Sequence, residues 1–268
     1  MDQAVPTIRP DELCAWLGAP AAPVVIDLRA AAEISERLIP GALRRSPADV
    51  QTWGPELPRA RPVVVFDLAG SEESGPTVAA LRRQGVPASR LEGGFAAWRE
   101  RKLPTRRVIA TNEDRWVTRE RPKIDRIACP WLVRRFINPG AAFIYAPKDQ
   151  VLAVAAETGA TPYDIDGVEF SHEGERCSFD TILRIYDIEI APLDRLAAIV
   201  RGADTSRHDL AEQCGGLFAI SLGLSANFPD DHEMLEHGMI IYDALYTWCR
   251  SLQAETHNWP PARTGGVT

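Results

Sequence analysis

The chain of 268 residues has few of the features that would assign it to a secreted, membrane-embedded or nucleic-acid-binding class. Its five cysteines are odd in number, widely spaced and without a CxxC pair, which indicates free thiols in a reducing compartment. A formal net charge of −7 argues against non-specific nucleic-acid binding, which needs a basic field. The amino terminus lacks a signal-peptide pattern, and the longest apolar stretch, near 217–228, is too short to cross a bilayer. We therefore expect a cytoplasmic protein without a membrane or nucleic-acid partner.

What is present is the composition of a folded globular protein, with 45% hydrophobic and 25% charged residues. A chain of this length exceeds the common size of one domain. Residues 106–115 are polar and show no periodicity, so we place a linker there. The predicted domains are residues 1–108 and 109–268.

The first predicted domain alternates short apolar runs with helical patterns. Residues 24–28 and 63–66 are typical of buried parallel strands. Pro10 and Pro47 occupy positions suited to the first residue of a helix, and Ser46 is a good N-cap residue. This alternation predicts an α/β domain built on a parallel sheet.

Several segments of this domain resemble the rhodanese family. In family order they are DLR (27–29), IPGA (39–42), VVVF (63–66) and LEGGFAAW (91–98). The resemblance implies the rhodanese fold. It also implies that the residue after the third segment should be the sulfur-carrying cysteine, with a loop whose backbone N–H groups wrap the persulfide.

That position holds Asp67 instead of cysteine. A carboxylate cannot be thiolated, and nucleophilic catalysis needs its nucleophile. Glu72 and Glu73 add negative charge where an anionic sulfur donor would approach. We expect no sulfurtransferase activity; the domain is a structural or dimerising module, or its acidic loop binds a cation.

The second predicted domain begins with an arginine-rich segment from Trp116. Residues 142–145 predict a strand, and residues 149–158 predict a helix closed by Gly159. Further helices are expected from about 179, 193 and 211, with a long helix over 230–252 whose first turn is acidic. The fold class is therefore α/β, with a rhodanese-like parallel-sheet domain followed by a mixed α/β domain that is helical in its second half.

Residues 116–260 resemble the domain that follows variable N-terminal modules in the chromate-resistance protein family. The motifs are RPKIDRIACPWL (121–132), SHEGERCSFD (171–180), GADT (202–205), GMIIYDALYTWC (238–249) and THNWP (256–260). The resemblance implies a role in chromate resistance as a regulator or accessory factor.

Cys129 is the first candidate for chemistry in this domain. Pro130 follows it and favours the first turn of a helix, where the helix dipole and nearby cations would stabilise a thiolate. Lys123, Arg126 and Arg134 could bind a doubly charged oxyanion such as chromate at the same helix start. The alternative is a buried cysteine among apolar neighbours.

Histidines and acids supply the second candidate site. His232 and Glu236 are one turn apart on the long helix, as are Glu233 and His237. Because Ile240 and Ala244 continue this face, we expect the helix to become buried beyond Gly238. We predict a transition-metal site, for iron, manganese or zinc, made by His172 with Glu236 and His232 or His237. Pairing of Glu236 with Arg126 or Lys123 is the rival interpretation.

The function predicted from these observations is a metal- and oxyanion-binding detoxification protein of chromate resistance or the stress response, with chromate or another small oxyanion as its partner. Two hypotheses stay open beside it. In the first, the metal or thiol assists turnover. In the second, the chain is a sensor or adaptor whose rhodanese fold serves for docking. The sequence also leaves open whether the chain forms a homodimer.

Overall fold

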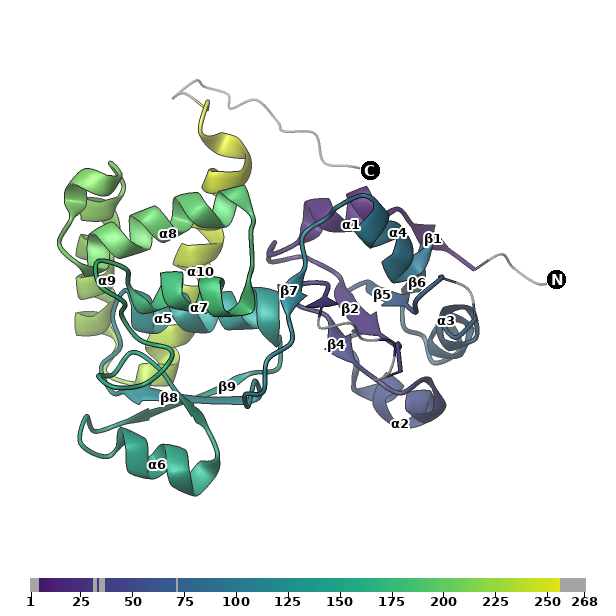
Figure 1. Cartoon of the computed structure of the whole chain (residues 1–268), viewed down its shortest axis with the longest axis horizontal. Helices are drawn as coiled ribbons and strands as arrows, with labels where there is room; N and C mark the ends of the chain where they lie inside the picture. Colours follow the sequence, from purple (N-terminus) through teal and green to yellow (C-terminus); the bar gives the residue numbers. More distant parts are fainter. Residues whose placement is uncertain (1–4, 31–32, 34–36, 71, 256–268) are drawn as a thin grey trace.

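The computed structural model describes residues 5–30, 33, 37–70 and 72–255. Figure 1 shows an N-terminal part around a sheet and a C-terminal part dominated by helices. The motif at 256–260 lies outside the described residues.

The N-terminal part is a five-stranded, all-parallel sheet in the order β1-β6-β5-β2-β4. Its central strand β5 consists of Val and Phe and is buried along its whole length, because helices cover both faces of a parallel sheet. The strands are β1 Thr7–Ile8, β2 Val24–Asp27, β4 Leu43–Arg44, β5 Val63–Phe66 and β6 Ala88–Leu91. The helices are α1 Pro10–Trp16, α2 Val50–Trp53, α3 Ser74–Arg83 and α4 Gly94–Glu100, with 3-10 turns η2 Pro47–Asp49 and η3 Gly54–Glu56. The predicted parallel-sheet domain is confirmed.

The segment that we expected to be an irregular linker is partly ordered into a sheet. β7 (Arg106–Arg107) pairs antiparallel with β3 (Arg37–Leu38) of the N-terminal part. Arg106 is 2% exposed and makes two hydrogen bonds of 2.8 Å to Glu113, and it also donates to the carbonyl of Ile137. A buried guanidinium group needs hydrogen-bond partners of this kind. A polar segment can therefore be ordered and buried, and its polar composition was not evidence for an irregular linker.

The C-terminal part begins with a small parallel sheet, β10-β8-β9, with α6 connecting β9 to β10. Its strands are β8 Arg115–Arg119, β9 Ala142–Ala146 and β10 Thr161–Pro162. Its helices are α5 Asp125–Leu132, α6 Val151–Thr158, α7 Ser178–Tyr186, α8 Ala191–Asp204, α9 Cys214–Asn227 and α10 Asp231–Thr247. A 3-10 turn η5 (His208–Leu210) precedes α9, and π-helical turns η4 (Val133–Ile137) and η6 (Trp248–Leu252) continue α5 and α10. The expected helical second half is confirmed.

The two parts share one hydrophobic core, which runs from Leu13 and Phe95 in the first to Phe136 and Tyr246 in the second. Gly41, in the IPGA motif, donates from its backbone N–H to the carbonyl of Phe136 at 2.7 Å. The backbone of Gly41 therefore lies directly against η4, and the rhodanese-like sheet is packed into the second domain rather than tethered to it.

The long helix α10 is not buried all round beyond Gly238. Ile240 is 64% exposed, whereas Met239 and Tyr242 are buried. α5, α8 and α9 pack against α10 and leave one face open to solvent. The expectation that this helix is buried beyond Gly238 is wrong for this reason. Within the described residues, no helix is long and apolar enough to span a membrane.

Candidate metal centre

Four polar side chains from four separate segments meet beside the start of α5. Asp125 is the first residue of α5, and Asp164 follows β10. His172 lies in the loop before α7, and Asp204 is the last residue of α8. The cluster therefore depends on the tertiary packing of the whole second domain.

His172 lies at the centre of this cluster. Its Nε2 is 3.2 Å from Oδ2 of Asp125, 3.3 Å from Oδ1 of Asp164 and 3.3 Å from Oδ2 of Asp204. Asp125 and Asp164 are buried, whereas the His172 side chain is 40% exposed, so the site opens to solvent on the histidine side.

Asp164 is the most heavily bonded of the three carboxylates. Burial opposes its ionisation, but hydrogen bonds from His172, Ser178 and Arg119 outweigh burial and lower its pKa to about 2. The Ser178 hydroxyl donates at 2.8 Å and Arg119 at 2.9 Å, and Nε of Arg126 lies 3.3 Å away. Asp164 is therefore an anion whose charge two arginines already balance.

Asp125 lacks an arginine partner among the described residues. Burial, and next the charge of Asp164, raise the pKa of Asp125 well above its usual range. The hydrogen bonds to Asp125, Asp164 and Asp204 in turn raise the pKa of His172 to about 12. Without another cation, an imidazolium ion is thus the counter-ion that holds these acids together.

The backbone that presents Asp125 is held in an unfavourable conformation. Ile124, immediately before it, has a φ of +39°, which is rare for a β-branched residue. The Tyr242 hydroxyl donates to the carbonyl of Ile124 at 2.7 Å and fixes this turn. Such outliers persist where surrounding contacts enforce them, and they are concentrated at functional sites.

The donor set fits a small divalent ion. One ligand atom each from Asp125, Asp164 and His172 lie within 4.8 Å of one another. Two carboxylate oxygens with one imidazole nitrogen suit manganese, iron or zinc, and Asp204 can supply a further oxygen. The sequence analysis found His172 but missed the three aspartates, although Asp125 and Asp204 lie inside the motifs at 121–132 and 202–205.

The metal ligands expected on α10 are not brought to His172. Glu236 is exposed and forms an ion pair with Arg134 at 2.8 Å. The rival interpretation expected an ion pair at Glu236, but with Arg126 or Lys123 as the partner. The His232 ring lies 5.4 Å from Tyr145, and His237 stacks on Phe228 at 4.0 Å. The structure therefore does not bring His232, Glu236 and His237 to His172, and the side chains that it gathers around His172 are aspartates.

Cys129 is not at a helix N-terminus. It is the fifth residue of α5 and 1% exposed, and burial, followed by the charge of Asp125, raises the pKa of its thiol well above its usual range. The prediction of a reactive thiolate is wrong, because the anionic cluster and burial both favour the neutral thiol.

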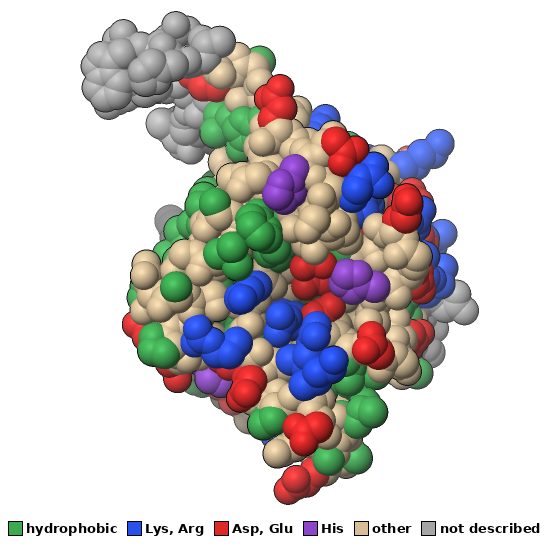
Figure 2. Space-filling view, turned by 90° about the vertical axis from the view of Figure 1, so that its left-hand side faces the viewer, with side chains coloured by type: hydrophobic (Ala, Val, Ile, Leu, Met, Phe, Trp, Pro, Cys, Tyr) green, Lys and Arg blue, Asp and Glu red, His purple; other side chains and the backbone are tan. Residues whose placement is uncertain are grey.

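The three cations predicted to bind an oxyanion are divided between different contacts. Arg126 contacts Asp164, whereas Arg134 bonds to Glu236 and to the carbonyl of Ala141. Lys123 is exposed and forms no ion pair within the described part of the chain. The structure therefore does not assemble them into one anion site. Figure 2 shows basic side chains gathered beside acidic and histidine side chains on one face of the molecule.

The rhodanese-like loop has its own anion, the carboxylate of Asp67. Asp67 is 6% exposed and accepts backbone N–H groups from Gly70, from Glu73 at 2.9 Å and from Ser74 at 2.9 Å. Burial raises the pKa of this carboxyl, but these bonds outweigh burial, and the net pKa is lowered. The fixed carboxylate thus fills the space between the N–H donors of the loop.

Comparison with known proteins places two families along the chain. The family model described as ChrB, C-terminal domain, matches residues 116–249, and the model of the rhodanese-like domain matches residues 9–101. Protein ChrB of Cupriavidus metallidurans is 32% identical over 146 residues, which are 54% of this chain and 44% of that protein. The chain thus spans less than half the length of this curated relative.

Two solved structures illustrate the likeness to known folds, and each covers little more than a third of this chain. A full-length protein from Lactobacillus plantarum is 28% identical, covers 38% of this chain and 88% of its own, and has a TM-score of 0.36. A rhodanese-like domain protein from Staphylococcus aureus is 25% identical, covers 35% of this chain and 90% of its own, and has a TM-score of 0.32.

Proposed function

Because the chain belongs to the ChrB family, whose C-terminal domain it carries behind a rhodanese-like domain, we propose that it serves in chromate resistance as a metal-dependent oxyanion-binding protein. The observation that carries the proposal is the convergence of Asp125, Asp164 and His172 on one point. Asp125, Asp164 and His172 would hold a divalent ion there, with His172 giving up the proton of its ring nitrogen to bind it.

Formal charges explain why metal binding would permit anion binding. With a divalent ion bound, the three carboxylates, a neutral His172, the ion and the two arginines on Asp164 would sum to +1. A tetrahedral dianion such as chromate would then meet an attractive site that contains a cation.

The rhodanese-like domain contributes no sulfur chemistry in this proposal. The Asp67 carboxylate already accepts the N–H groups that a persulfide would need. The domain instead packs against η4 through Gly41 and supports the second domain.

The metal is tested by isothermal titration of the full-length protein, purified without a histidine tag and treated with chelator, using Mn²⁺ and Zn²⁺ in turn. We expect one ion per chain. His172→Ala and Asp125→Asn should lower the affinity at least tenfold, whereas His208→Ala, which alters an exposed histidine of the same domain, should leave it unchanged. Since one proton leaves His172, the apparent affinity should rise about tenfold per pH unit from pH 6.5 upward.

The oxyanion is tested with sulfate and chromate on the Zn²⁺-loaded protein, because zinc is redox-inactive and leaves chromate intact. Both dianions should bind the loaded protein and fail to bind the metal-free protein. A chain that binds neither Mn²⁺ nor Zn²⁺, with a melting temperature indifferent to both, would leave His172 as the sole counter-ion and overturn the proposal. Equal anion binding with and without metal would overturn the part of the proposal that makes oxyanion binding depend on the metal.

A further inference from the structure

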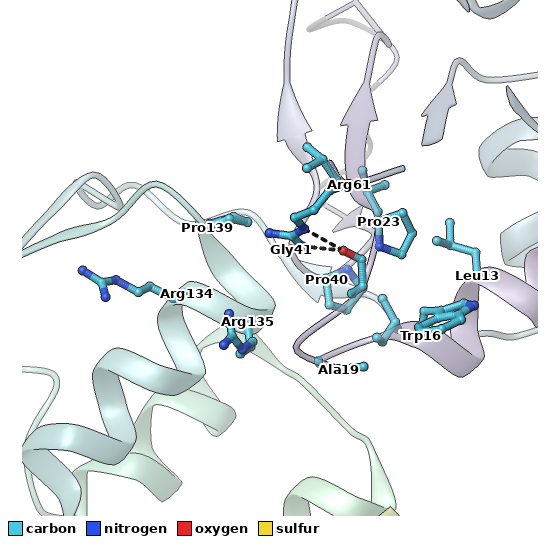
Figure 3. A pocket seen from close by; sticks show the side chains of 15 residues that line it. Leu13, Trp16, Ala19, Pro23, Pro40, Gly41, Arg61, Arg134, Arg135 and Pro139 are labelled. Carbon is cyan, nitrogen blue, oxygen red and sulfur yellow. Dashed lines mark hydrogen bonds between the residues drawn. The ribbon is translucent and has the colours of Figure 1, made fainter. Parts of the chain in front are cut away.

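A cavity of about 100 Å³ lies between the two domains and shares no lining residue with the acidic cluster. Figure 3 shows Arg61 entering it from the first domain and Arg135 from the second, with apolar side chains along the remaining wall. Arg134 also belongs to the lining, but it extends away from the cavity toward its partner Glu236.

Arg61 and Arg135 bring an excess of positive charge to this cavity. Nε and one Nη of Arg61 donate to the carbonyl of Ala22, and no acidic side chain of the described residues lies within ion-pair distance of it. Burial, followed by the charge of Arg135, lowers the pKa of Arg61. Arg135 is itself neutralised by Asp243, which accepts two hydrogen bonds of 2.8 and 2.7 Å. Two guanidinium groups and one carboxylate leave a single positive charge, which suits a monoanion.

The rest of the cavity suits an apolar body. Leu13, Trp16, Pro23 and Pro40 line it, and Trp16 keeps 42% of its surface exposed although it is a large aromatic residue. A polar anchor beside apolar and aromatic walls is the usual make-up of a small-molecule pocket. An inorganic dianion would leave these walls unused.

The cavity is fixed by close contacts between the domains at Gly18 and Gly41. A Cβ on Gly41 would lie 2.9 Å from the carbonyl oxygen of Arg135, and a Cβ on Gly18 would overlap Phe136. These contacts fix the two domains against each other beside the cavity, so a ligand meets a pre-formed site.

We propose that this interdomain cavity binds a small organic monocarboxylate with a ring, whose carboxylate is held by Arg61 and Arg135 and whose ring packs on Trp16. The second Nη of Arg61 makes no hydrogen bond within the described residues and can donate to a carboxylate. The site is independent of the proposed metal centre and does not rest on it.

The probe is 4-fluorobenzoate, observed by ¹⁹F NMR on the full-length protein in the presence of chelator, with 4-fluorobenzamide as its neutral counterpart. We expect saturable binding of the acid, and binding of the amide at least tenfold weaker. Arg61→Gln and Trp16→Ala should each weaken binding of the acid at least fivefold. Arg59→Gln, which alters an exposed arginine near Arg61 in sequence, should not change it.

Two further results decide the proposal. His172→Ala should bind 4-fluorobenzoate as the unmodified protein does, which separates this site from the metal centre. Absence of saturable binding would overturn the proposal. Equal binding of acid and amide, or unchanged binding in Arg61→Gln, would also overturn it, because the cavity would then select no carboxylate.

Discussion

Single residues in this protein have their properties set by what is packed around them rather than by their neighbours in sequence. Cys129 and Cys177 are both buried close to the acidic cluster, and burial, followed by Asp125, raises the pKa of each thiol. Cys14 is the one cysteine of the five that is partly exposed. Because the pKa of Cys14 is also raised, solvent exposure distinguishes the thiols more than their pKa values do.

We predict that Cys14 is the first thiol modified by iodoacetamide near neutral pH, and that Cys129 reacts last or only on unfolding. Alkylation needs both exposure and thiolate, and Cys129 has neither. Timed quenching followed by peptide mass spectrometry measures the order. Labelling of Cys129 ahead of Cys14 in the folded protein would contradict the burial of α5.

His172 gives a pH-dependent contribution to stability in the metal-free protein. Its pKa is raised from 6.5 to about 12 by the three aspartates, so the folded state retains its proton where the unfolded state loses it. The stabilisation is complete below about pH 6.5 and declines as pH rises toward 12. We expect His172→Ala to lower the free energy of unfolding most at pH 6 and progressively less at pH 7.5 and 9.

Urea unfolding with chelator present measures this difference at each pH. His208→Ala is the matched control, and its effect should be small and should not follow the same slope. If His172→Ala lowers the free energy of unfolding by the same amount from pH 6 to 9, the histidine acts through packing and not as an imidazolium ion.

At the scale of elements, the loop after β5 owes its shape to a side chain inside it. Asp67 binds the backbone N–H groups of Gly70, Glu73 and Ser74, which would otherwise be left without acceptors. We predict that Asp67→Ala lowers the free energy of unfolding by about 1–3 kcal/mol, the usual cost of leaving buried donors unsatisfied. Chemical denaturation measures it, with the exposed Glu72→Ala as control. If both variants have equal stability, the carboxylate does not organise the loop.

The contact between IPGA and η4 depends on a glycine backbone. Gly41 has a φ of +75°, and Gly167 has a φ of +82°, but a Cβ added to Gly167 would have nothing within 4 Å of it. Gly167→Ala should lower the free energy of unfolding by about 1–2 kcal/mol, because alanine is strained in a left-handed backbone conformation. Gly41→Ala should cost about 1–3 kcal/mol more, because the methyl group also meets the Arg135 carbonyl. Thermal or urea unfolding of the two variants compares them directly, and equal losses would disprove the close contact.

Elements were predictable where local chemistry decides them. Val63–Phe66 is a strand because four apolar residues can be buried only at the centre of a covered sheet, and Pro10 begins α1 because its ring suits the first turn. Gly159 ends α6 with a φ of +68°, as a helix stop requires.

The candidate site was predictable only in part, since its members come from distant segments. His172 could be found as a histidine in a polar turn, but Asp125 and Asp204 are separated from it by 47 and 32 residues, and their convergence depends on packing. Glu236 was wrongly expected to lie beside His172, because the periodicity of a helix does not show which of its faces other helices cover. Its partner Arg134 comes from 102 residues away.

The whole molecule is held by one core and by polar contacts between its domains. Leu13, Phe95 and Trp98 belong to the same cluster of buried side chains as Phe136 and Tyr246. The Tyr246 hydroxyl donates to the carbonyl of Leu17 at 3.3 Å, and Arg37 pairs with Asp187 at 2.6 Å. A ligand in the interdomain cavity would therefore bind a surface that exists only when both domains are folded.

From this shared core we predict that the two domains unfold as one unit, although chains of this length often unfold in steps. Hydrogen exchange followed by mass spectrometry in increasing urea should show β5 and α5 losing protection at the same concentration. Phe136→Ala should lower that concentration for both elements, because it removes an aromatic ring from the interdomain core at a cost of about 3–5 kcal/mol. Leu152→Ala, at a site 58% exposed, should shift neither. Protection of β5 that persists after α5 has exchanged would show that the rhodanese-like domain stands alone and that the shared core adds little to its stability.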